Sequence, residues 1–239
     1  MNDGILETLL LDRTTKKNIL WATAELGARE IQIADVSKII PRHEKNRADQ
    51  KLRTKNRAEI FTPPEICKLQ NDFIAAPFEN RPEDFIRAKF LEITCGEAPY
   101  ITSRYHAATG EKIPAEKRVG LLDRKLRAVS APVGDWTKIA LRSVYGYEFQ
   151  GDNLFLARRN IFDTAAEFLS DKLPAKELRK ILPEVAEIIS WNFWQMDGLT
   201  GSPPFMESEN LFGGANCLIM DWDAKKAVEF GTLARGARR

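Results

Sequence analysis

The sequence contains little cysteine and little histidine. Three cysteines (Cys67, Cys95 and Cys217) and two histidines (His43 and His106) are scattered over 239 residues. A disulfide framework or a Cys/His metal site needs more such residues at closer spacing. No apolar run approaches the roughly 18 residues that a membrane span requires, and the N-terminus lacks the charged-then-apolar plan of a signal peptide. We therefore expect a cytoplasmic protein whose activity requires no metal.

The chain also lacks a large excess of charge and a dinucleotide-binding fingerprint. Its 36 Lys and Arg residues against 34 Asp and Glu leave a net charge of +2, and no GxGxxG motif is present to hold a pyrophosphate. Basic charge is concentrated between residues 42 and 57, where seven Lys or Arg residues accompany two acids. Such a run is either a solvated connector or a segment that neutralises nucleic-acid phosphates.

Short apolar runs alternate with amphipathic segments along most of the chain. The runs predict buried strands at residues 89–93, 143–147 and 188–196. Apolar residues at helical spacing predict helices at residues 5–11, 17–26, 63–73, 135–141, 152–169 and 175–187. Strands that alternate with helices favour a parallel α/β sheet. The last third, with apolar runs at 217–220 and 227–230 around a polar turn, predicts a hairpin.

Polar residues follow each predicted strand, at the edge where a parallel sheet binds ligands. Glu92 and Gly96 follow the first strand; a glycine lets the backbone approach a ligand closely, and an acid suits an ammonium group. Glu148 ends the second strand, where an acid commonly binds ribose hydroxyls. Asp197 ends the third strand and is placed to accept a hydrogen bond from an adenine amino group. Together these residues describe S-adenosylmethionine better than a dinucleotide.

Several stretches of the sequence are distinctive, above all Glu92–Tyr100 (EITCGEAPY). The full set is Arg13–Thr23, Ala58–Ile66, Leu91–Ile101, Gly120–Leu126, Tyr145–Asn153 and Trp191–Leu199. On these residues, which span nearly the whole chain, it resembles the adenine-specific DNA methyltransferases of restriction–modification systems, especially the group labelled restriction endonuclease subunit M. The resemblance implies a Rossmann-like fold, S-adenosylmethionine as cofactor and DNA as partner.

The resemblance also implies a role for each residue of the cofactor site. A Phe-Thr-Pro segment opens a helix beside the methionine end of the cofactor, and a Cys-Gly loop wraps the methionine portion. The acids after the second and third strands then contact ribose and adenine. The residues assigned in this way are Phe61, Thr62, Pro63, Glu92, Thr94, Cys95, Gly96, Glu97, Glu148 and Asp197.

One departure from the family pattern is a long insertion over about residues 104–135. Its basic residues, which include Arg104, Arg118, Arg124, Lys125 and Arg127, suggest a surface facing DNA. A second departure concerns the clamp that holds the acceptor base, an Asn/Asp/Ser-Pro-Pro-aromatic turn after a fourth strand. Ser202–Phe205 matches the letters, but only four residues separate it from Asp197, so no strand fits between them. We expect a surface turn there, and the catalytic residues are unassigned.

We therefore expect a Rossmann-like methyltransferase fold that is incomplete at its C-terminal side. Residues 1–57 are expected to be a helical extension and basic connector, and residues 58–239 the cofactor-binding domain. The leading function is the modification subunit of a restriction–modification system, methylating adenine N6 in DNA. The alternatives are a non-catalytic subunit that needs a separately encoded catalytic or restriction partner, and a truncated remnant with an exposed sheet edge.

Overall fold

The computed structural model describes residues 1–45, 62–106, 109–206 and 216–232. Its centre is a parallel sheet of three strands in the order β1-β2-β3 (Phe90–Glu92, Val144–Glu148 and Phe193–Gln195). The expectation of a mixed α/β chain with a parallel sheet is confirmed. Because Glu92 lies opposite Gly146, and Glu148 lies opposite Gln195, the carboxyl ends of the three strands meet at one edge.

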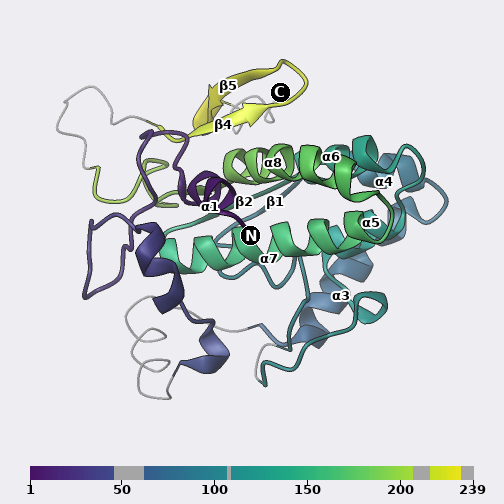
Figure 1. Ribbon diagram of the computed structural model, residues 1–239, viewed down its shortest axis with the longest axis horizontal. Helices are drawn as coiled ribbons and strands as arrows, with labels where there is room; N and C mark the ends of the chain where they lie inside the picture. The colour runs from purple at the N-terminus through teal and green to yellow at the C-terminus, as the bar shows by residue number, and fades with distance from the viewer. Residues whose placement is uncertain (46–61, 107–108, 207–215, 233–239) are drawn as a thin grey trace.

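Helices cover one face of this sheet, and a hairpin covers part of the other. In Figure 1 the long helices α7 (Gly151–Ser170) and α8 (Ala175–Asn192) lie side by side in front of the strands. Further helices in the described part of the chain are α1 (Asp3–Leu10), α3 (Pro64–Ala75), α4 (Pro82–Arg87), α5 (Leu121–Arg127) and α6 (Val133–Arg142). Short 3-10 turns occupy Ile33–Lys38, Arg42–Glu44, Ala76–Phe78 and Ala115–Lys117. Among the described residues no helix is long and apolar enough to cross a membrane.

The predicted hairpin near the C-terminus is confirmed. Strands β4 (Leu218–Asp221) and β5 (Lys226–Glu229) pair in antiparallel fashion. Cys217 and Ile219 pack against Trp194 and Met196 on the face of the sheet opposite the long helices. This packing gives the sheet a second apolar layer over β2 and β3.

The predicted helix at residues 17–26 is wrong. The segment instead forms turns and isolated bridges, pairing Leu11 with Asn18 and Leu20 with Glu30. The Asp12 carboxylate accepts a hydrogen bond from the backbone N–H of Thr14 just after α1, a local turn that competes with helix formation. Ile19 and Ile31 are nevertheless buried in the same core as α7 and α8, so the N-terminal residues pack onto the sheet domain.

The third predicted strand is too long. The structure continues α8 to Asn192 and leaves only Phe193–Gln195 as strand. The apolar run at 188–196 is compatible with either state, since both a buried helix and a buried strand are apolar throughout. The side-chain amide of Asn192 donates to the carbonyl oxygens of Leu141 and Val144, and this marks the change from helix to strand.

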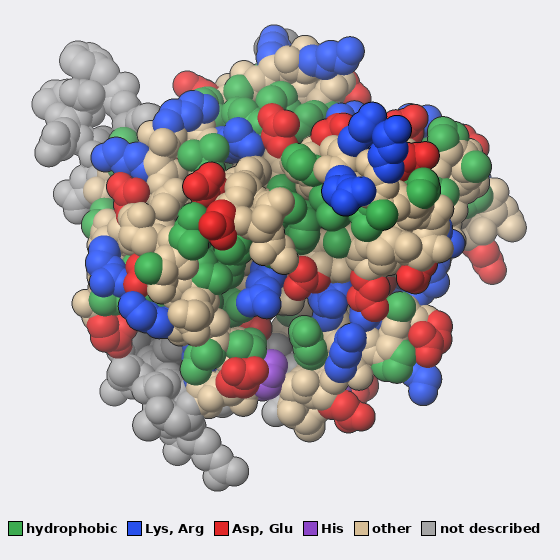
Figure 2. Space-filling view, viewed as in Figure 1, with side chains coloured by type: hydrophobic (Ala, Val, Ile, Leu, Met, Phe, Trp, Pro, Cys, Tyr) green, Lys and Arg blue, Asp and Glu red, His purple; other side chains and the backbone are tan. Residues whose placement is uncertain are grey.

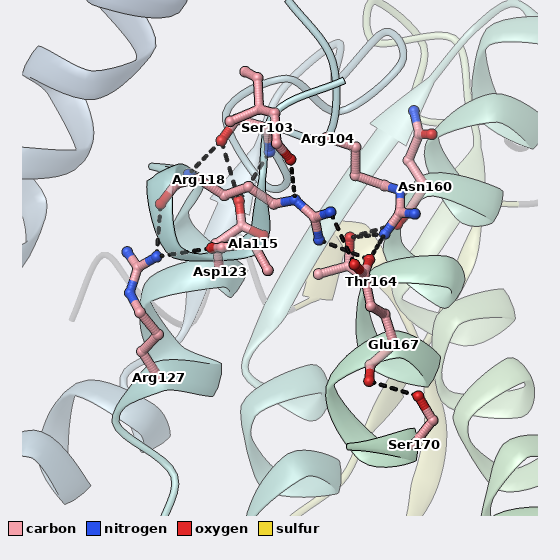
Figure 3. Close-up of polar contacts among 12 residues, drawn as sticks. Ser103, Arg104, Ala115, Arg118, Asp123, Arg127, Asn160, Thr164, Glu167 and Ser170 are labelled. Carbon is pink, nitrogen blue, oxygen red and sulfur yellow. Dashed lines mark hydrogen bonds and ion pairs between the residues drawn. The ribbon is translucent and has the colours of Figure 1, made fainter. Parts of the chain in front are cut away.

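The prediction of a basic surface on residues 104–135 is also wrong for three of the residues named for it. Arg104, Arg118 and Lys125 are buried, at 8%, 2% and 0% exposure. Figure 3 shows the reason for the two arginines: both donate to the carboxylate of Glu167 on α7, each at 2.9 Å. On the face seen in Figure 2, basic and acidic side chains are interspersed and form no extended basic field.

Lys125 joins three segments of the core. Its ammonium donates to the carbonyl oxygens of Ile86 and Ala88 at 3.1 and 2.7 Å and to Ser143 Oγ at 2.6 Å. The two carbonyls belong to the end of α4, and Ser143 precedes β2. Lys125 therefore fixes the start of the sheet against α4 and α5.

Replacing Lys125 by Met should lower the free energy of unfolding by about 2–4 kcal/mol, because two buried carbonyls and a buried hydroxyl lose their donor. Urea unfolding followed by circular dichroism measures the change. Lys180→Met, at an exposed position on α8, is the matched control and should shift stability by less than about 0.5 kcal/mol. Equal effects of the two substitutions would contradict this role for Lys125.

Candidate cofactor site

A small pocket lies at the carboxyl end of β1. Six of the ten residues that the sequence assigns to a cofactor site line it: Thr62, Glu92, Thr94, Cys95, Gly96 and Glu97. The pocket walls enclose about 80 Å³, which is room for a group of a few heavy atoms. The pocket therefore has room for no more than one end of a larger ligand.

The loop after β1 has an unusual backbone. Thr94, Gly96 and Ala98 all have positive φ angles, at 50°, 55° and 63°. This conformation is costly for a residue with a side chain, and such strain is found most often at binding and active sites. The backbone N–H of Cys95 donates to the carbonyl oxygen of Tyr147 at 2.8 Å, which holds the loop against β2.

Glu148 connects this loop to the end of β2. Its carboxylate accepts hydrogen bonds from the backbone N–H groups of Gly96 at 2.9 Å and Gln150 at 3.1 Å. Burial raises the pKa of Glu148, and the two backbone donors act in the opposite direction. Glu148 therefore holds the loop through Gly96 but does not itself line the pocket.

Glu92 is the titratable group that distinguishes the pocket. None of the described residues donates a hydrogen bond to its carboxylate, and burial raises its pKa to about 7. A partly buried carboxylate in this state gains most from a cationic ligand, since an ammonium group restores the charge compensation lost on burial. The thiol of Cys95, in contrast, is fully buried and its pKa is raised by burial, which argues against a nucleophilic thiolate.

The other predicted residues lie apart from the pocket or outside the described chain. Phe61 lies outside the described residues, and Pro63 is the exposed residue that precedes α3. Asp197 does not line the pocket; its Oδ1 accepts the backbone N–H of Leu199 at 2.8 Å and closes a local turn. The structure does not bring Asp197 together with Glu92 as the sequence suggested.

Ser202–Phe205 forms a turn, as expected, but not a surface turn. Ser202 and both prolines are buried, whereas Phe205 is half exposed with a φ of 60°. The Phe205 ring contacts Phe149, the residue after Glu148, at a centroid distance of 5.9 Å. The turn is therefore packed against the end of β2 without following a strand of its own.

Sequence reasoning missed two polar residues of the pocket. Arg42 comes from the N-terminal segment and Asn153 from the first turn of α7. Arg42 belongs to the basic run noted above, and Asn153 falls in a stretch that carries the family resemblance. Neither signal shows that the residue reaches the end of β1, because that depends on how distant segments pack.

The chain matches no protein-family model, and no curated protein or solved structure is significantly similar to it. The function must therefore be inferred from the geometry of the pocket and from the sequence pattern.

The raised pKa of Glu92 has a measurable consequence for stability. An unfolded glutamate loses its proton near pH 4.5 and folded Glu92 near pH 7, so the folded state binds more protons in that window. The wild type should therefore lose stability relative to Glu92→Gln as the pH rises from 4.5 to 7. Urea unfolding of both proteins across this range tests the sign, and carbon NMR of the carboxyl groups tests the pKa. A measured pKa of Glu92 near 4.5 would contradict the conclusion that burial raises it.

Proposed function

We propose that this protein binds S-adenosylmethionine and is the modification subunit, or part of one, of a restriction–modification system acting on adenine in DNA. The observation that carries the proposal is the convergence of six residues, from two segments about 30 positions apart, on one pocket at the carboxyl edge of a parallel sheet. This is the place where open α/β sheets bind their ligands. The proposal requires more than a parallel α/β sheet. It requires a Rossmann-like methyltransferase fold that is incomplete at its C-terminal side.

The pocket chemistry fits the amino-acid end of the cofactor. The carboxylate of Glu92 has no described partner and suits the ammonium group, while Arg42 on the same wall suits the carboxylate. Glu148 would bind the ribose hydroxyls after exchanging one of its backbone donors. Asp197 would accept from the adenine amino group with Oδ2, since its Oδ1 accepts the backbone N–H of Leu199. When bound, the cofactor supplies a methyl group on a sulfonium, which a base amine can take directly.

A non-catalytic subunit completed by a separately encoded partner is the second candidate. In the described sheet β1 is an edge strand; its central residue Leu91 is 44% exposed, and Ile93, just after the strand, is 63% exposed. An apolar strand edge of this kind is a site where a further strand can add. Cofactor binding without methyl transfer to DNA by the isolated chain, and transfer once the partner is added, would favour this candidate.

Calorimetric titration with S-adenosylmethionine tests the cofactor site. We expect saturable binding by the wild type, with an affinity that rises from pH 6 to pH 8 as Glu92 loses its proton. Glu92→Gln should bind about ten-fold or more weakly at pH 8 and close to wild type at pH 6, because it lacks only the charge. Glu177→Gln, at an exposed position on α8, is the control. A folded wild-type protein that does not bind the cofactor would refute the proposed function.

A further inference from the structure

The two edges of the parallel sheet differ in how the rest of the chain covers them. At the β3 edge, backbone carbonyls that β2 does not use have other partners. The carbonyl oxygen of Phe193 accepts a hydrogen bond from Arg158 Nε at 2.8 Å. That of Gln195 accepts one from the Cys217 thiol at 3.4 Å. β1 forms the other edge, and no further strand lies beside it in the described part of the chain.

The backbone of Leu91, the central residue of β1, faces this open side. The N–H of Phe90 donates to the carbonyl oxygen of Ser143, one residue before its partner Val144. Bonding to one neighbour alternates along a strand, so Phe90 and Glu92 face β2 and Leu91 faces away. Neither the N–H nor the carbonyl oxygen of Leu91 has a hydrogen-bond partner among the residues that the structure describes.

The side chains at this edge are apolar and uncovered. Leu91 lies opposite Tyr145, on the face of the sheet that carries the hairpin. The hairpin packs against β2 and β3, whereas Leu91 and Ile93 lie outside that cluster and are 44% and 63% exposed. Parallel sheets are normally covered on both faces. An uncovered apolar strip at the edge of one therefore indicates a contact with another chain.

The edge also lacks the features that usually prevent strands from pairing between molecules. Such features are exposed charge, proline and β-bulges. β1 contains no proline, and its register with β2 is continuous, without a bulge. Lys89, the cation just before the strand, is paired with Asp223 of the hairpin turn, and Glu92 lines the pocket. The edge therefore remains free to accept a strand.

A second copy of this chain is complementary to the edge. In antiparallel pairing about Leu91, the two Leu91 residues exchange both backbone hydrogen bonds and their side chains lie side by side. Phe90 then lies opposite Glu92 of the second copy, and Lys89 lies opposite Ile93. No like charges face each other in this register, and a net charge of only +2 causes little repulsion between copies. The arrangement has two-fold symmetry, the commonest in oligomers.

We infer that β1 is a dimer interface, at which two copies of this protein pair antiparallel about Leu91 and join their sheets into one. The inference goes beyond the proposed function and does not rest on it. It assigns the edge to a second copy rather than to the separately encoded partner considered above. Because so short a strand buries less than the roughly 1,000 Å² of a stable interface, the dimer is weak and depends on concentration.

Disulfide trapping of the intact protein tests the register. Leu91→Cys places the two Cα atoms about 5.5 Å apart, which suits a disulfide. Ile93→Cys places them more than about 13 Å apart, which is too far. On mild oxidation we expect the Leu91→Cys protein to form a covalent dimer and the Ile93→Cys protein to form little. The natural cysteines are buried and should not interfere, namely Cys67, Cys95 and Cys217.

The two cysteine variants also control for random collision. Ile93 is more exposed than Leu91, so chance encounters would oxidise Ile93→Cys at least as fast. Equal rates, or a faster reaction of Ile93→Cys, would overturn the inference.

Sedimentation equilibrium measures the association itself. We expect the mean mass of the wild type to rise from one copy towards two as the concentration increases. Leu91→Lys should weaken the dimer about ten-fold or more, because two ammonium groups would face each other across the axis. Leu199→Lys adds the same charge at a 98% exposed position in the turn after β3, at the far edge of the sheet. It should leave the association unchanged.

Circular dichroism establishes that both lysine variants fold, and the trapping experiment decides the case even where Leu91→Lys does not. A wild-type mass of one copy at every concentration would overturn the inference. Association that the two lysine substitutions weaken equally, or that neither weakens, would overturn it as well, because the contact would then lie elsewhere on the protein.

Discussion

One buried cation, Arg158, fixes the arrangement on which two cavities depend, the pocket at the carboxyl end of β1 and a cavity between the N-terminal segment and α7. Its side chain is fully buried, and it donates to the carbonyl oxygens of Phe193, Leu9, Leu11 and Ser190. Burying a guanidinium costs several kcal/mol, and these carbonyls, which end α1 and α8 and begin β3, offset that cost. Burial lowers the pKa of Arg158 to about 10, so it stays charged at neutral pH. Arg158 lies on α7, the helix that also carries Asn153 and Asn160 into the two cavities. Its hydrogen bonds therefore fix the position of α7 against the sheet.

The sequence pattern predicts the regular parts of this fold well and their boundaries less well. The helix expected at 152–169 is α7, Gly151–Ser170, because its apolar stripe is long and continuous. The run at 188–196 was misassigned for a physical reason: residues buried on all sides show no period, so helix and strand look alike. The helix expected at 17–26 fails because Ala22 and Gly27 adopt left-handed conformations that end any helix. The secondary structure of such segments is decided by tertiary packing.

The same distinction applies to the candidate site. Glu92, Gly96 and Glu148 meet because the carboxyl ends of parallel strands always lie at one edge, so their proximity follows from the sheet alone. Asp197 is two residues beyond the last residue of β3, and a local turn is enough to take it away. The cavity between the N-terminal segment and α7 is lined in part by irregular segments with no period, Thr102 among them, and nothing in the sequence indicates that Thr102 and Arg104 are buried. Basic residues in an insertion predict a charged surface; the carboxylate of Glu167 explains why Arg104 and Arg118 are buried instead, and the carbonyls at the end of α4 explain the burial of Lys125.

Most buried charge in this protein is compensated within the chain. Arg158 and Lys125 are surrounded by carbonyls, and Arg118 makes a two-pronged contact with Glu167. A chain that satisfies its deepest charges so completely leaves few donors and acceptors without partners by accident. Glu92 is the exception, a carboxylate with no described donor in the pocket at the carboxyl end of β1. The pocket at the carboxyl end of β1 therefore favours a ligand with a cationic group.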